Sequence, residues 1–129
     1  MQVTRREFVA VLVFAQNEDV SHETLLEVLG QFTSALSEGN AEAAIGVTDS
    51  MGTLGRQLRD LLASNEVGSA IDPIEWTDKQ TVVLDWLLEI RSADPVGAVK
   101  RKREKVTCRF VKKGKRWKIA ALDPVGFFQ

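Results

Sequence analysis

The sequence has no tyrosine, one cysteine, one histidine and only three prolines in 129 residues. A lone cysteine excludes an internal disulfide and any metal site built from several cysteines. Cys108 lies in an alternating pattern that indicates a small buried apolar residue. No stretch approaches the roughly 20 apolar residues that span a bilayer. We therefore predict no membrane span, no metal and no cofactor.

Net charge is also nearly absent, at −1, but the charges are unevenly distributed. Between residues 98 and 129, eleven lysines and arginines stand against only Glu104 and Asp123. The basic runs at 100–103 and 112–116 are expected in a loop and a turn. No exposed aromatic platform is interleaved with these residues, and paired strands can neutralise one another across a sheet. We therefore predict no nucleic-acid partner.

The composition, with 44% hydrophobic and 27% charged residues, is typical of one globular domain. Residues 1–16 form a separate segment, because Arg5-Arg6, Phe8 and a short apolar run resemble a twin-arginine export signal. The alternative is an N-terminal extension that packs on the domain. We expect an exported protein, with a cytoplasmic one as the alternative, and a single domain over residues 17–129.

Three helices are predicted in the first half of the chain. Ser21 is a good helix cap, and apolar residues then recur at three- and four-residue spacing as far as Gly39-Asn40. A short alanine-rich helix follows from Ala41 to about Val47. The helical spacing returns from Thr53 to Ala63. Each helix has one apolar stripe that must pack against another element.

From Val67 onward the spacing changes from about four residues to two, which indicates β-strands. Pro73 suits an edge strand because it lacks a backbone donor. Pro124 is expected to end the sheet. The predicted strands are 70–76, 81–91, 105–112 and 116–123, with a long connection over 92–102 and a tight turn at 113–114. The fold class is therefore α+β: three N-terminal helices packed on a curved antiparallel sheet of about four strands.

The two faces of this sheet differ in character. Apolar residues of strand 81–91 alternate with charged ones, so that Trp86 faces the helices and Asp85 faces away. In the last strand, the same alternation places Trp117 inward and Leu122 outward. The outer face then combines charges with Val83, Leu87 and Leu122, which is a candidate homodimer surface.

The order of three helices and a long-stranded sheet, with the segments Ser37–Ala43, Val83–Ile90 and Trp117–Pro124, resembles the nuclear transport factor 2-like superfamily. The likeness covers about residues 21–128, and its most indicative piece is the final Trp-x-Ile strand. It implies a cystatin-like cone and a homodimer formed through the outer sheet face. Within that superfamily, the sequence looks most like secreted bacterial members.

Catalytic members of that superfamily place an aspartate or histidine base inside the cone, with a tyrosine or second acid as donor. Here tyrosine is absent, and His22 falls in the first turn of the first helix, where an exposed side chain is expected. The remaining candidates are Asp123, which shares strand parity with Trp117, and Asp49, which follows the second helix. An isomerase, dehydratase or cyclase with one of these bases is the alternative function.

The preferred function is a non-enzymatic domain that binds a small apolar ligand or a protein partner. A partly open cone would offer the concave apolar interior that small ligands favour. In a closed cone, the same side chains form an ordinary core. The residues predicted to line this pocket are Phe32, Leu36, Leu58, Trp86, Phe110 and Trp117.

Overall fold

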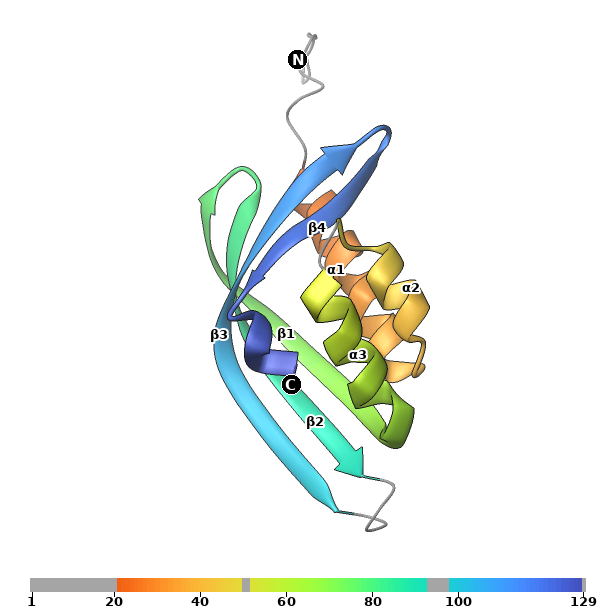
Figure 1. Ribbon diagram of the computed structural model, residues 1–129. Helices are drawn as coiled ribbons and strands as arrows, with labels where there is room; N and C mark the ends of the chain where they lie inside the picture. Colours follow the sequence, from red (N-terminus) through yellow and green to blue (C-terminus); the bar gives the residue numbers. More distant parts are fainter. Residues whose placement is uncertain (1–20, 50–51, 93–97, 129) are drawn as a thin grey trace, which may run out of the picture.

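The computed structural model describes residues 21–49, 52–92 and 98–128, whose arrangement is shown in Figure 1. The predicted class and element order are confirmed, with helices first and an antiparallel sheet after them. The predicted export signal at 1–16 lies outside the described residues. The elements are α1 (His22–Ser37), α2 (Ala41–Gly46), α3 (Gly52–Ser64), β1 (Asn65–Asp78), β2 (Thr81–Ser92), β3 (Val99–Lys113), β4 (Arg116–Asp123) and the 3-10 turn η2 (Val125–Phe128).

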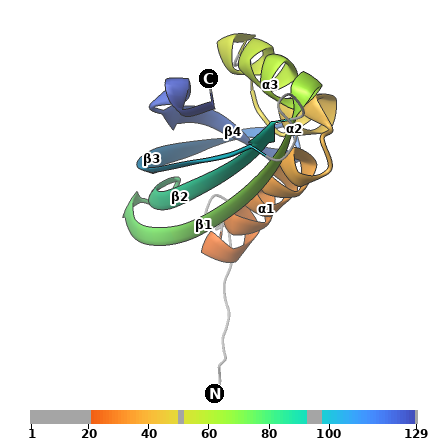
Figure 2. The same ribbon diagram turned by 90° about the horizontal axis from the view of Figure 1, so that it is seen from below.

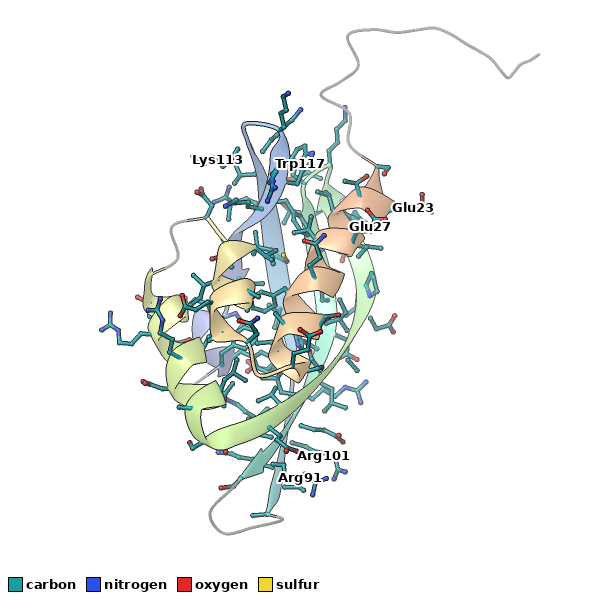
Figure 3. All side chains as sticks on the ribbon, turned by 90° about the vertical axis from the view of Figure 1, so that its right-hand side faces the viewer. Glu23, Glu27, Arg91, Arg101, Lys113 and Trp117 are labelled. Atoms are coloured by element: carbon teal, nitrogen blue, oxygen red, sulfur yellow. The ribbon has the colours of Figure 1, made fainter. Side chains whose placement is uncertain are left out.

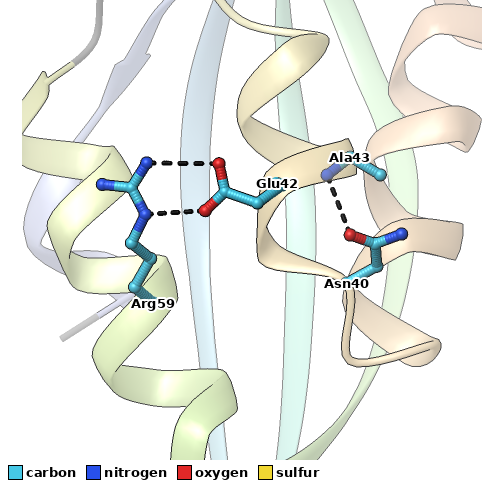
Figure 4. Close-up of polar contacts among 4 residues, drawn as sticks. All are labelled: Asn40, Glu42, Ala43 and Arg59. Carbon is cyan, nitrogen blue, oxygen red and sulfur yellow. Dashed lines mark hydrogen bonds and ion pairs between the residues drawn. The ribbon is translucent and has the colours of Figure 1, made fainter.

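The helix boundaries follow from local capping. The Ser21 hydroxyl accepts the Thr24 backbone N–H at 3.2 Å, and Gly39 adopts a positive φ of 72° after α1 ends. Asn40 then caps α2, because its side-chain oxygen accepts the Ala43 N–H at 3.0 Å (Figure 4). These contacts confirm the predicted start at Ser21 and the break at Gly39-Asn40.

An exposed ion pair joins the two shorter helices. Arg59 of α3 donates from Nε to Glu42 of α2 at 2.7 Å and from a terminal nitrogen at 3.3 Å (Figure 4). These hydrogen bonds lower the pKa of the Glu42 carboxyl and raise that of Arg59. The ion pair links α2 and α3 but adds little stability, because both side chains are solvated.

The sheet has the order β1-β2-β3-β4, with each neighbouring pair antiparallel. β1 lies at an edge, as Pro73 predicted, and its register shifts just after that residue. Two strands are longer than predicted, because β1 begins at Asn65 and β3 at Val99. Their added segments are polar and lack the apolar alternation of strands, yet both find backbone partners along β2.

The basic run 100–103 lies in β3, so its prediction as part of a loop is wrong. It pairs with the end of β2, which carries the acidic partners. Arg101 donates from Nε to Glu89 at 2.8 Å, and Arg103 donates to Asp85 at 2.6 Å. The carboxylates that pair with this basic run therefore come from the neighbouring strand, which lies earlier in the sequence.

All three helices and η2 lie on one side of the curved sheet, as Figures 1 and 2 show. The core fills the space between the two layers and includes the inward row of β2. On the opposite side, no described helix covers the sheet. The inward residues of β2 are Val82, Leu84, Trp86, Leu88 and Ile90, each 8% exposed or less.

A bulge in β4 changes which side chains face the core. Arg109 pairs with Ala121, but the next residue of β3 pairs with Ile119, so Ala120 is an extra residue in β4. The alternation is thereby reversed, and Leu122 is buried at 3% exposure. Its predicted outward position is wrong. The parity argument for Asp123 fails for the same reason, and Asp123 is exposed.

Candidate functional site

The inner face of the sheet holds a cluster of aromatic side chains. Five of the six predicted pocket residues lie in this core at 0–1% exposure, whereas Trp117 is half-buried at its margin. The Trp86 indole N–H donates to the Ser69 hydroxyl at 2.7 Å, so this buried donor is satisfied. Five surface hollows formed by described residues are lined by other side chains.

The C-terminal turn η2 completes this cluster, a feature that the sequence reasoning missed. Phe127 and Phe128 are 1% and 0% exposed. The Phe128 ring lies edge-on to Trp86 and Phe32, with centroid distances of 5.4 and 5.8 Å. Two adjacent phenylalanines at the chain end were the available signal, because such a pair rarely stays in water. They occupy the side of the sheet where the sequence predicted a ligand.

Lys102 ties η2 to the sheet. The β3 register places Lys102 opposite Leu88, on the inner face. Its Nζ donates to the Phe127 carbonyl oxygen at 2.8 Å and lies 5.7 Å from the centroid of that ring. A cation over an aromatic face is attracted to it. The C-terminal aromatic pair is therefore held by packing and by a charge-assisted hydrogen bond.

The structure does not bring the two candidate aspartates together. Asp49 donates its backbone N–H to Ile119 at 2.8 Å, and its carboxylate lies 3.7 Å from Lys113 Nζ. Figure 3 shows Lys113 and Trp117 at the β3–β4 turn. Asp123 is exposed at the other end of β4. Neither arrangement is an acid-base pair directed at a shared substrate position.

The single histidine is exposed, at the position that the sequence predicted. The His22 ring stacks on Trp76 with a centroid distance of 3.7 Å and an interplanar angle of 3°. Trp76 is half-buried beside the core. This contact packs the first turn of α1 against β1 and forms no catalytic dyad with a described carboxylate.

Cys108 is buried, and we therefore expect its thiol to react slowly with reagents in solution. Burial raises the pKa of its thiol from 9.0 to about 12. At pH 8 we expect a thiol-reactive dye to modify the folded protein about 1,000-fold more slowly than the unfolded chain, because the thiolate is the reacting form. A folded-state rate within about 10-fold of the unfolded rate would contradict this burial.

The raised pKa of the Cys108 thiol makes the stability of the protein depend on pH. Its pKa is higher in the folded state, so its contribution to stability is fully present below pH 9.0. As the pH rises above 9.0, the unfolded chain ionises first and the contribution declines until the pH reaches about 12.

The outer face, which no described helix covers, carries every second residue of β2. Val83 and Leu87 are half-buried and lie on either side of Asp85. The hydrogen bonds from Arg103 lower the pKa of the Asp85 carboxyl. Beside this ion pair, Leu87 and Ala70 line a shallow hollow of about 180 Å³. The arrangement is an apolar centre framed by charges, which is a common design of binding surfaces.

Charge on this face is segregated from edge to edge. The register places acidic residues mainly on β1 and β2, and basic residues on β3 and β4. Figure 3 shows Arg91 and Arg101 at the end of the sheet far from Lys113. The acidic members are Glu66, Asp72, Glu75, Asp85 and Glu89, and the basic members are Arg101, Arg103, Lys105, Arg109 and Lys118; the exceptions are Arg91 on β2 and Asp123 on β4.

The described residues contain neither a metal-binding cluster nor a membrane-spanning helix. Within residues 21–49, 52–92 and 98–128, no group of three or more histidine, cysteine, aspartate or glutamate side chains is placed to hold a metal ion. No helix in these ranges is long and apolar enough to cross a bilayer.

The helices, the curved four-stranded sheet and their order define a nuclear transport factor 2-like α+β fold. The sequence matches no family model and no curated protein. One similar solved structure comes from Xanthomonas campestris and is described as a candidate calcium/calmodulin-dependent protein kinase II association domain. It has a TM-score of 0.63 and 12% identity, covering 84% of this chain and 89% of that one.

A second similar structure is a protein of unknown function from Mycobacterium tuberculosis. Its TM-score is 0.61 and its identity 11%, over 78% of this chain and 68% of that one. At identities this low, both likenesses show the fold alone.

Proposed function

We propose that this chain is a non-enzymatic association domain that pairs with a second copy of itself through the outer face of its sheet. The observation that carries the proposal is this face, which no described helix covers and where half-buried Val83 and Leu87 of β2 lie next to the basic strand β3. Apolar side chains framed by charges favour a protein partner.

Charge segregation favours a second copy over an unrelated protein. A two-fold axis in the plane of the interface, parallel to the strands and between β2 and β3, would place the acidic strands of one copy over the basic strands of its mate. The contact between Arg103 and Asp85 within one chain leaves Lys105 and Arg109 as additional positive groups on the basic half. A self-complementary surface of this kind needs no other partner.

The inner face of the sheet favours a protein partner over a small apolar ligand, the two kinds of partner that the sequence predicted. Phe127 and Phe128 pack on the aromatic cluster, where a small apolar ligand was predicted. Asp49 and Asp123 lie apart from each other, so the alternative enzyme has no acid-base pair to support it. The protein from Xanthomonas campestris is described as an association domain, a role compatible with the one proposed.

Replacing Leu87 with aspartate should break the proposed dimer. A charge in the centre of an interface loses apolar contact and remains unpaired, which costs about 2 kcal/mol or more and weakens association by ~30-fold. Sedimentation equilibrium over a range of concentrations measures this change. Ala43→Asp is the matched control, because Ala43 is exposed on α2, in the opposite layer, and should leave the dimer intact.

Two results would overturn the proposal. One is a wild-type protein that stays monomeric at the highest soluble concentration. The other is a dimer that Leu87→Asp leaves as tight as before. Raising the salt concentration should also weaken the wild-type dimer, because charges at the rim of the face are screened.

A further inference from the structure

The β3–β4 hairpin ends in a cluster of cations that neither the core nor the proposed dimer face uses. The register pairs Lys113 with Arg116, so Gly114 and Lys115 form a two-residue turn, with Gly114 at a positive φ of 63°. The hairpin extends past α2 and α3 at one end of the molecule, as Figures 1 and 3 show. Its four cations are exposed, and we call them the basic tip: Lys112, Lys113, Lys115 and Arg116.

Like charges lie directly opposite each other in the basic tip. Lys113 and Arg116 are cross-strand partners, an arrangement that lowers stability unless other charges compensate for it. The carboxylate of Asp49 lies 3.7 Å from Lys113 Nζ, and none of the other three cations forms an ion pair with a described residue. The fold therefore leaves most of this charge unneutralised, in contrast to the basic run 100–103, which lies beside carboxylates of β2.

Charge over the whole chain is separated in the same sense. The net charge of the chain is −1, so the residues outside the basic tip carry a net charge of −5. An anionic surface attracts the tip and repels the rest of the molecule, which orients the protein with its tip toward that surface. Three of the four cations are lysines, which act as point charges, whereas arginine is favoured where a single phosphate is held by paired hydrogen bonds. The pattern therefore favours a diffuse anionic surface over one defined anion.

We propose that the basic tip docks this domain on a lipid bilayer that contains anionic phospholipid. Each lysine or arginine near such a surface strengthens binding by about 5-fold. Trp117 follows the tip directly and is half-buried, and tryptophan is a residue type that concentrates at the membrane–water interface. A single-stranded nucleic acid fits less well, because its binding sites combine a basic groove with exposed stacking rings, and the tip is a projection. The proposal does not depend on the dimer, since it concerns the end of one hairpin.

Cosedimentation of the full chain with vesicles tests this docking. The probes are vesicles of phosphatidylcholine alone and vesicles in which about a third of the lipid is phosphatidylglycerol. At low salt we expect the anionic vesicles to bind the protein about 100-fold more tightly than the neutral ones, and we expect added salt to weaken this binding. A DNA duplex at the same concentration of phosphate is added as a competitor, and it should not release the protein from the anionic vesicles.

Two double variants locate the contact. Lys115→Gln combined with Arg116→Gln should weaken binding to anionic vesicles by about 20-fold, because it removes two of the four cations. It should melt at or above the wild-type temperature, because it also removes the like-charge pair. Arg91→Gln combined with Lys100→Gln is the matched control, since it removes one arginine and one lysine, both exposed, at the end of the sheet far from the tip. This control should change binding by less than about 2-fold.

Binding to anionic vesicles that falls with the tip variant and persists with the control variant supports the proposal. Four results would overturn it: a wild-type protein that binds neither kind of vesicle, equal binding to neutral and anionic vesicles, equal binding by the two double variants, or release from the vesicles by DNA. The last result would mean that the tip binds nucleic acid. The melting temperatures show that a loss of binding is not a loss of the fold.

Discussion

Replacing Phe128 with alanine is expected to lower the free energy of unfolding by about 3–5 kcal/mol. The side chain is fully buried and packs edge-on against Phe32, Trp86 and Phe127. Its removal forfeits the transfer of a whole aromatic ring from water and leaves a cavity that the surrounding rings cannot easily close. For a domain of this size, the loss is a large fraction of the total stability.

Chemical denaturation followed by tryptophan fluorescence measures this loss, since Trp86 belongs to the same cluster. Phe128→Leu is the matched control, because it keeps most of the apolar volume and should cost about 1 kcal/mol. A loss below about 1 kcal/mol for Phe128→Ala would mean that η2 is a loosely attached tail and not a part of the core. The sheet interior would then be open to ligands, as the sequence predicted.

The sequence was sufficient to predict the layers of this fold. Ser21 and Asn40 cap helices through short local contacts, and the strict alternation of β2 separates Trp86 from Asp85 on opposite faces. These features depend on residues close in the chain, so that local pattern determines them. Pro73 indicated an edge strand for an equally local reason, the missing donor.

Features that depend on distant partners could not be predicted in the same way. Arg101 and Arg103 lie in a strand because β2 supplies both backbone partners and the carboxylates of Glu89 and Asp85. The burial of Phe128 depends on a surface assembled from α1, α3 and β2. A pattern read along the chain shows that such residues are basic or apolar, but it does not show what they meet.

The candidate site shows the same limit. The sequence placed a ligand at the inner aromatic cluster because its apolar side chains share a face, and that inference could not include the C-terminal turn that packs there.

Because of the bulge at Ala120, the neighbouring residues Ala121 and Leu122 should respond very differently to the same substitution. Leu122 is 3% exposed and faces the core, although the alternation of β4 predicted that it faces water. We expect Leu122→Asp to destabilise the protein by about 4 kcal/mol or more, because a buried carboxylate without a partner loses its hydration. A well-dispersed NMR spectrum should then be lost, or be recovered only at acidic pH, where the carboxylate is protonated.

Ala121→Asp is the matched control, one residue earlier in the same strand. Ala121 is half-buried and lies opposite Arg109 on the outer side, so a new carboxylate gains a cation as its cross-strand neighbour. Its expected effect on stability is within about 1 kcal/mol. Without a bulge, the order of the two effects would be reversed, since uninterrupted alternation puts residue 121 inside and residue 122 outside. The pair of variants therefore tests the bulge itself, whatever the total stability of the domain.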